Sequence, residues 1–163
     1  MTFMPSKANE PVTAQDYKRR LDDIDWAHFQ TAYGRADDVP AELLRLASSD
    51  HCTAMEATHK LWCGLCHQHA YVSSAALPAL PFILEVLDSA NDELTVEILD
   101  ILTGFAICST LGPKGASPNE WERNLRDKLR NELPRFTVLT SHGNEEIAGF
   151  AERIVENLNT YVA

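Results

Sequence analysis

The chain has 163 residues, of which 45% are hydrophobic, so it has enough apolar content for one folded domain and is not a disordered chain. Its 24 acidic and 14 basic residues give a formal net charge of −10, which disfavours direct binding to phosphate backbones. No apolar run approaches the roughly 20 residues of a membrane-spanning helix. The excess of carboxylates favours a basic partner instead.

The beginning of the chain is polar and contains two prolines. We expect residues 1–12 to be a loose leader, followed by a single domain over residues 13–163. The leader has no apolar stretch of the kind that a secretory signal requires. We therefore expect a cytoplasmic protein with reduced cysteines.

Helical spacing of apolar residues and capping signals predict helices throughout and no strand. Asp25 is expected to begin a short helical turn that carries Trp26, Phe29 and Tyr33 as apolar anchors and ends at Gly34. Two antiparallel helix pairs should follow, at about 39–48 with 51–66 and about 75–89 with 92–110.

Capping residues mark where these central helices begin. Asp38, followed by a proline, is the expected cap of the first of them, and Asp50 and Asn91 are the expected caps of the two longer ones. After a loop predicted at residues 112–118, a third and less regular pair is expected over residues 119–160.

The two central helix pairs repeat one another. A shift of 41 positions places Pro40 on Pro81 and Leu46 on Leu87. Helical hairpins that repeat at this distance are typical of the HEAT and armadillo class, in which neighbouring hairpins stack and bury a common core. We therefore expect an all-α fold, a short right-handed α-solenoid of HEAT/armadillo-like helical hairpins.

The segment from Trp26 to Leu87 resembles a family of bacterial HEAT-like repeat proteins. The matching residues are Trp26, Ala32-Tyr33-Gly34, Asp37-Asp38-Val39-Pro40, His67-Gln68 and Pro81-Phe82. The family often has glycine after His-Gln, where this chain has His69, so the turn there is expected to differ. Several such proteins are taken to be immunity proteins that neutralise a neighbouring toxin, which is the function that the resemblance implies.

The run Cys63-Gly-Leu-Cys66-His67 matches the Cys-x-x-Cys-His pattern of c-type haem attachment. Haem attachment belongs outside the cytoplasm, and no export signal is expected. A thioredoxin-like reading would need a βαβ context, which the helical pattern does not provide. We therefore predict no cofactor and no disulfide between these cysteines.

Cysteines and polar residues form one stripe on the helix at 51–66, roughly opposite its core-facing side. The stripe consists of Cys52, Glu56, His59, Cys63 and Cys66. His59 and Cys63 are one turn apart and could chelate a metal, but one helix cannot supply four tetrahedral zinc ligands. Reduced cysteines acting as small apolar groups are the other interpretation, and we predict no metal site.

Glu93, Glu97 and Asp100 share one face of the helix at 92–110, away from its apolar side. The 41-residue shift places this face beside Glu56 and His59 of the preceding repeat. The resemblance implies that such second helices line a concave surface. We predict these five residues as the partner-binding site, against the alternative of a solvated helix face.

These patterns together predict a non-enzymatic protein-binding module, an immunity protein that neutralises a basic bacterial toxin by direct binding. No catalytic residue is predicted, and His67 and Gln68 are expected to form a structural bend by bonding the carbonyls of the helix end. Two alternatives stay open: a metal-dependent enzyme or metal-binding protein built on His59 and Cys63, and a scaffold or adaptor subunit. DNA glycosylases of HEAT-like architecture need a basic groove, which this chain lacks.

Overall fold

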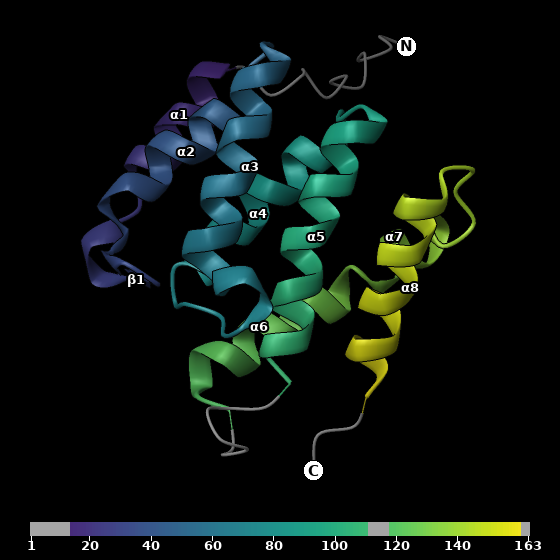
Figure 1. Ribbon diagram of the computed structural model, residues 1–163. Helices are drawn as coiled ribbons and strands as arrows, with labels where there is room; N and C mark the ends of the chain where they lie inside the picture. Colours follow the sequence, from purple (N-terminus) through teal and green to yellow (C-terminus); the bar gives the residue numbers. More distant parts are fainter. Residues whose placement is uncertain (1–13, 111–117, 161–163) are drawn as a thin grey trace, which may run out of the picture.

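A computed structural model describes residues 14–110 and 118–160, which are helical almost throughout (Figure 1). The leader predicted at residues 1–12 and most of the loop predicted at 112–118 lie outside these ranges. Within the described ranges, no helix combines the length and the apolar character needed to cross a membrane.

The helices account for nearly all regular structure in the described ranges. They are α1 Ala14–Asp22, α2 Val39–Leu46, α3 His51–Cys66, α4 Ala76–Leu87, α5 Asp92–Cys108, α6 Glu120–Asn131, α7 Leu133–Leu139 and α8 Glu145–Asn159. Short 3₁₀ helices are η1 Trp26–His28, η2 Ala36–Asp38 and η3 His67–His69, and the strands are β1 Gln30–Thr31 and β2 Gly34–Arg35. The all-α prediction is confirmed, as are the two central helix pairs, α2 with α3 and α4 with α5.

The caps of the two long helices are as predicted. The Asp50 carboxylate accepts a hydrogen bond from the Thr53 N–H at 3.0 Å, and the Asn91 amide oxygen accepts one from the Leu94 N–H at 2.9 Å. The predicted cap at Asp38 is wrong, because its side chain makes no capping bond. The chain is already helical there, since η2 leads directly into α2.

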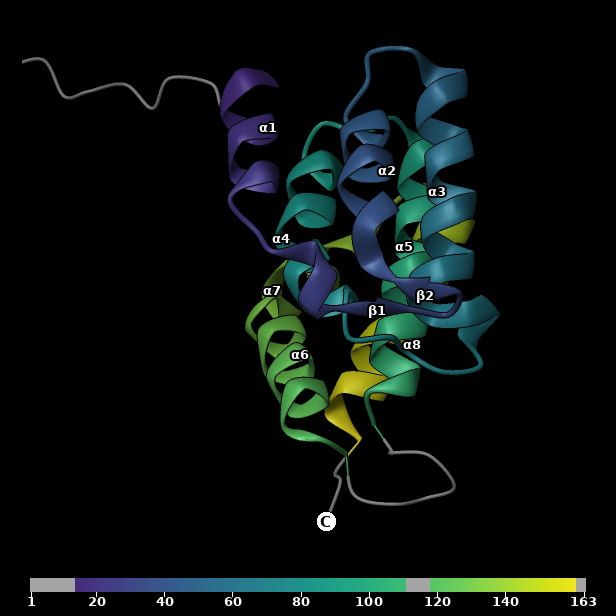
Figure 2. The ribbon, with the colours of Figure 1, turned by 90° about the vertical axis from the view of Figure 1, so that its left-hand side faces the viewer.

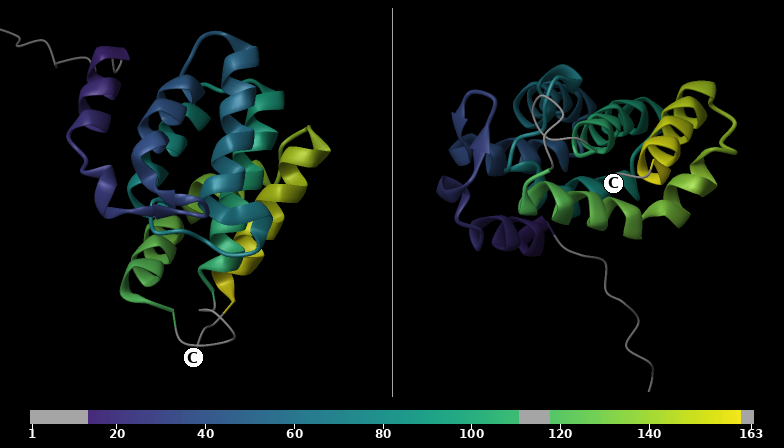
Figure 3. Two further views of the ribbon diagram at one scale, coloured as in Figure 1. Left: turned by 60° about the vertical axis from the view of Figure 1, so that its left-hand side comes forward. Right: turned by 90° about the horizontal axis from the view of Figure 1, so that it is seen from below.

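The helices are arranged in two layers. Seen from below, α3, α5 and α8 lie in one row, and α6 and α7 lie in the other (Figure 3). α2 packs against both α3 and α4, and α7 packs against α8. The pairs α2/α3, α4/α5 and α7/α8 therefore each contribute their second helix to the same layer. The apolar core lies between the two layers, where Leu43, Leu61, Ile98 and Phe136 are at most 2% exposed.

The segment between α1 and α2 differs from the prediction. The predicted helical turn does begin after Asp25, as η1, but it ends before Gly34. Residues 30–35 form a minimal antiparallel hairpin at the same end of the molecule as the loop after α3 (Figure 2). The Ala32 N–H donates to the Gly64 carbonyl of α3 at 2.8 Å, so a contact distant in sequence determines this conformation. Gly34 adopts a φ of 122°, which side-chain-bearing residues rarely adopt. Tyr33, expected as a buried anchor, is 71% exposed at the hairpin tip.

A buried arginine connects the two layers at the C-terminal ends of α5 and α8. The Arg126 guanidinium on α6 donates to the carbonyls of Asn157 and Thr160, at 2.7 and 2.9 Å, and to the Thr110 hydroxyl at 2.8 Å. Carbonyls at a helix C-terminus lack partners within the helix and carry partial negative charge. A single cation on α6 therefore satisfies the ends of two helices in the other layer.

Candidate partner-binding surface

The layer formed by α3, α5 and α8 carries the carboxylates that the sequence analysis singled out (Figure 1). On α5, Glu93 is exposed and Glu97 and Asp100 are partly exposed, whereas Ile98 and Leu102 on the other side of the helix are fully buried. The shared face predicted from helical spacing is therefore present in the folded chain. We call Glu93, Glu97, Asp100 and the adjacent Glu146 of α8 the carboxylate surface.

Histidines from α3 and the turn after it approach these carboxylates from one side. His51 Nε2 lies 3.0 Å from the Glu93 carboxylate, and His69 Nε2 lies 2.8 Å from the Asp100 carboxylate. His59 acts electrostatically on Glu97. The 41-residue shift predicts His59 beside Asp100, but in the structure His69 pairs with Asp100 and His59 acts on Glu97. The histidines of α3 and its turn are therefore offset along α5 from the predicted register.

Glu97 lies on this surface within electrostatic reach of Asp100, Glu146 and His59. Partial burial raises the pKa of Glu97, and the negative charges of Asp100 and Glu146 raise it further, while His59 acts in the opposite direction. The ionised form of Glu97 is therefore disfavoured in the folded protein. A cation brought close to it would reverse that effect.

Permanent cations are paired elsewhere on the molecule. Within residues 14–110 and 118–160, no Lys or Arg forms an ion pair with any member of the carboxylate surface. Arg20 pairs with Glu85 of α4, and Arg135 pairs with Asp88 and Glu132. Among the described residues, the side chains that form ion pairs with the carboxylate surface are thus histidines.

Glu56, predicted as a member of the partner-binding site, pairs with α2 instead of joining the carboxylates of α5. Its carboxylate is 2.6 Å from the Arg45 guanidinium of α2, which also pairs with Glu42. The structure therefore brings His59, Glu93, Glu97 and Asp100 together and directs Glu56 toward α2. Glu146 joins the group from α8, which sequence spacing within one helix could not show.

His59 and Cys63 are the pair on which the alternative metal-binding interpretation depends. His59 Nε2 and Cys63 Sγ are 3.7 Å apart, as one helical turn allows. Among the residues that the structure describes, no group of three or more His, Cys, Asp or Glu side chains is arranged to hold a metal ion. Two donors on an exposed helix face do not make a tetrahedral zinc site.

The four cysteines are free thiols, and two of them are enclosed. Cys66, predicted for the exposed stripe, is fully buried, and its thiol donates to the Trp62 carbonyl at 3.3 Å. Burial raises the pKa of the Cys66 thiol to about 12 and that of Cys108 to about 11. The thiolate is the reactive form of cysteine, so neither residue is suited to nucleophilic or redox chemistry at neutral pH.

Alkylation of the native protein should therefore separate the cysteines by burial. We expect iodoacetamide at about pH 8 to modify exposed Cys52 at least about tenfold faster than Cys66, since alkylation requires an accessible thiolate. Peptide mass spectrometry over time gives the rates, and the same reaction in concentrated urea is the control in which the difference should vanish. Equal rates in the native protein would show that the turn around Cys66 opens readily.

The turn after α3 has an unusual backbone. His67, Gln68 and His69 have φ angles of 40°, 55° and 66°, all in the left-handed region, which costs roughly 1–2 kcal/mol for each residue that is not glycine. As the C-cap of α3, His67 donates its backbone N–H to the Trp62 carbonyl, whereas its buried ring Nδ1 has no partner among the described residues. The ring of His69 instead contacts the middle of α5, since its Nε2 lies 2.8 Å from the Asp100 carbonyl oxygen.

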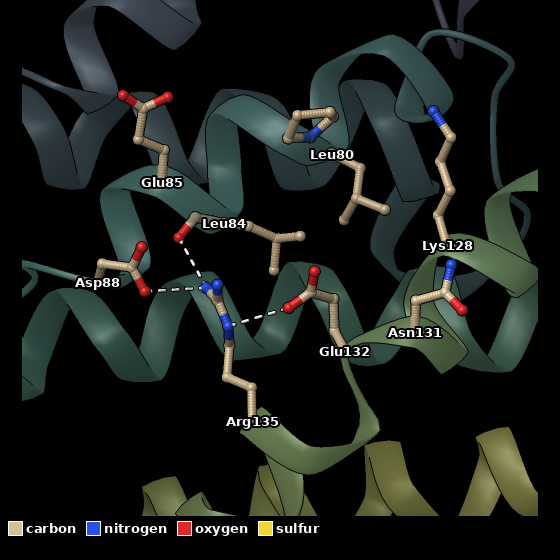
Figure 4. A pocket seen from close by; sticks show the side chains of 9 residues that line it. Leu80, Leu84, Glu85, Asp88, Lys128, Asn131, Glu132 and Arg135 are labelled. Atoms are coloured by element: carbon tan, nitrogen blue, oxygen red, sulfur yellow. Dashed lines mark hydrogen bonds and ion pairs between the residues drawn. The ribbon is translucent and has the colours of Figure 1, made fainter. Parts of the chain in front are cut away.

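The groove between α4 and the α6–α7 segment offers a different kind of site (Figure 4). Its volume is about 350 Å³, but its central guanidinium, Arg135, already binds the Leu84 carbonyl, Asp88 and Glu132 at 3.0–3.1 Å. Charged groups that satisfy one another in this way hold α4 and α7 together. They leave few polar groups free to recognise a ligand.

Comparison of the chain with protein-family models, with curated proteins and with solved structures finds no significant match. Evidence for its function therefore comes from its own residues.

Proposed function

We propose that this chain is a non-enzymatic immunity protein that binds a basic toxin domain through the carboxylate surface. The observation that carries the proposal is the clustering of Glu93, Glu97, Asp100 and Glu146 without a Lys or Arg partner among the described residues. Like charges held together raise the free energy of the unbound surface. Lys and Arg side chains of a partner would relieve this repulsion, and the net charge of −10 would speed their approach.

The architecture supports the same proposal. We interpret α2/α3, α4/α5 and α7/α8 as three HEAT-like hairpins of a short right-handed α-solenoid, with α6 as an insertion before the last hairpin. In such an arrangement the second helices share one surface, which is where the carboxylates lie. An immunity protein of this kind would act in the cytoplasm, where its toxin would otherwise do damage.

Co-expression tests the proposal. The probe is a basic protein from a neighbouring gene, chosen by its charge and expressed with and without the chain while growth is measured. We expect that protein to stop growth when expressed alone, the wild-type chain to restore growth, and a catalytically inactive form of the toxin to co-elute with the chain in gel filtration. A toxic neighbour that is neither bound nor neutralised would contradict the proposal.

Glu97→Gln should show that partial burial and repulsion by neighbouring carboxylates both disfavour ionised Glu97 in the free protein. The raised pKa means that the folded state binds a proton at Glu97 more readily than the unfolded state, so ionised Glu97 weakens the fold at neutral pH. We expect the variant to raise the free energy of unfolding at pH 7 by about 0.5 kcal/mol, a small value because solvent screens a partly exposed group.

This gain should depend on pH. As the pH falls through the raised pKa of Glu97 in the folded protein, Glu97 takes up a proton and the wild-type protein regains the lost stability. The extra stability of the Gln variant should therefore vanish below 4.5, the ordinary pKa of Glu. Urea unfolding at about pH 7 and about pH 4 measures it, with Glu156→Gln on the exposed side of α8 as the control. A gain at pH 4 as large as that at pH 7 would rule out the electrostatic explanation.

A further inference from the structure

Two exposed tyrosines surround His67 at the end of the molecule where the hairpin meets the turn after α3. Tyr33 is 71% exposed and Tyr71 is 47% exposed, which is unusual for large aromatic side chains. The Tyr71 ring stacks on the His67 ring at 4.9 Å between centroids, and the Tyr33 ring meets it edge-on at 6.1 Å. We call these three rings the aromatic patch.

The aromatic patch is held on a rigid support. The Gln30 N–H donates to the Ser74 hydroxyl at 2.9 Å, and the Ala75 N–H donates to the Gln30 carbonyl at 3.0 Å, so β1 is bonded to the loop that carries Tyr71 (Figure 2). The left-handed turn at residues 67–69 leads from α3 into this loop. Strained backbone that the surrounding structure maintains is commonly found at functional sites. The rings are thus already positioned before a partner arrives.

The patch also borders the carboxylate surface. His69 belongs to the same turn as His67, and its ring binds Asp100 of α5 at 2.8 Å. Tyrosine faces attract cations, and the planar guanidinium of arginine stacks on them better than the ammonium of lysine does. Nucleic-acid bases also stack on tyrosine, but the neighbouring carboxylates repel phosphates. Exposed rings beside unpaired carboxylates therefore favour an arginine side chain of a protein.

The geometry points to the aromatic patch as a second contact for a basic partner, with an arginine side chain held against Tyr33 and Tyr71. This inference rests on the proposed function, because it assumes that the carboxylate surface attracts the same partner. It adds a preference for arginine over lysine, which carboxylates alone would provide only weakly.

Two synthetic peptides test the preference without knowledge of the natural partner. An octamer of arginine and an octamer of lysine are titrated into the full chain at low salt, and affinity is measured by calorimetry. We expect the arginine octamer to bind about three- to tenfold more tightly than the lysine octamer. The Tyr33→Ala/Tyr71→Ala variant should lose this preference, whereas Tyr33→Phe/Tyr71→Phe should keep it because the rings remain.

A second pair of measurements distinguishes the two proposals. Circular dichroism verifies that both variants are folded, which exposed positions permit. Equal affinity of wild type for the two octamers, or an arginine preference that survives Tyr33→Ala/Tyr71→Ala, would overturn the inference and leave the carboxylate surface standing. Octamer binding that is unchanged in Glu93→Gln/Glu97→Gln/Asp100→Gln would overturn the carboxylate surface itself. Tyrosine-dependent binding of an octathymidylate would show that the patch takes nucleic-acid bases and would also overturn the inference.

Discussion

Arg126→Met is expected to lower the free energy of unfolding by about 3 kcal/mol, because carbonyls at the ends of α5 and α8 lose a charged donor. Methionine is flexible and apolar, so it keeps much of the packing of the arginine stem while removing its donors. Urea unfolding followed by circular dichroism measures the change. Arg126→Lys should be intermediate, since an ammonium cannot span both helix ends as a guanidinium does.

The matched control is Arg123→Met on the exposed side of the same helix. That substitution should change stability by no more than about 0.5 kcal/mol, because it removes a surface charge without a buried partner. If Arg126→Met were as stable as wild type, the helix ends would have to find other partners. The role assigned to α6 in joining the layers would then be wrong.

Glu97→Lys is expected to weaken binding to the basic partner by about 100-fold or more, since close charge pairs at interfaces couple by roughly 1.5–7 kcal/mol and the substitution turns attraction into repulsion. Folding should survive, because Glu97 is partly exposed and a lysine there would lie beside Asp100. Calorimetry with the inactive toxin gives the affinity, and thermal unfolding verifies the fold.

The control for this experiment needs the same change of charge on the other layer. Glu122 on α6 is unsuitable, because it is only 4% exposed and its carboxylate accepts a hydrogen bond from the Asn119 amide at 2.8 Å. Asp127 on α6 is exposed, so Asp127→Lys changes net charge equally without disturbing a buried group. Equal loss of affinity in both variants would mean that only overall charge matters and that the carboxylate surface is not the contact.

Local signals predicted the helices well because the interactions that form them are local. Asp50 and Asn91 cap their helices through amides three residues onward, so the sequence contains everything the caps need. The hairpin at residues 30–35 depends instead on the Gly64 carbonyl, which is distant along the chain. No local pattern identifies that contact, and for this reason the sequence wrongly predicts that the helical turn extends through Tyr33.

The candidate site was predicted in part for the same reason. Helix geometry alone places Glu93, Glu97 and Asp100 on one face. The partners of these carboxylates depend on how α3 and the turn after it pack against α5, so the pairing of Asp100 with His69 could not be read from spacing. The pairing of Glu56 with Arg45 likewise depends on how α2 packs against α3. Burial of charged residues such as Arg126 also escapes pattern analysis, since charged side chains are rarely buried.

Carboxyl footprinting tests the central claim most directly. The chain, alone and bound to the inactive toxin, is treated with a carbodiimide and glycine ethyl ester, and mass spectrometry measures labelling at each Asp and Glu. If the toxin binds the carboxylate surface, labelling of Glu93, Glu97 and Glu146 should fall strongly in the complex. Labelling of Asp127 and Glu120 on α6 should stay unchanged. Protection of the α6 carboxylates, with Glu97 labelled as in the free chain, would contradict it.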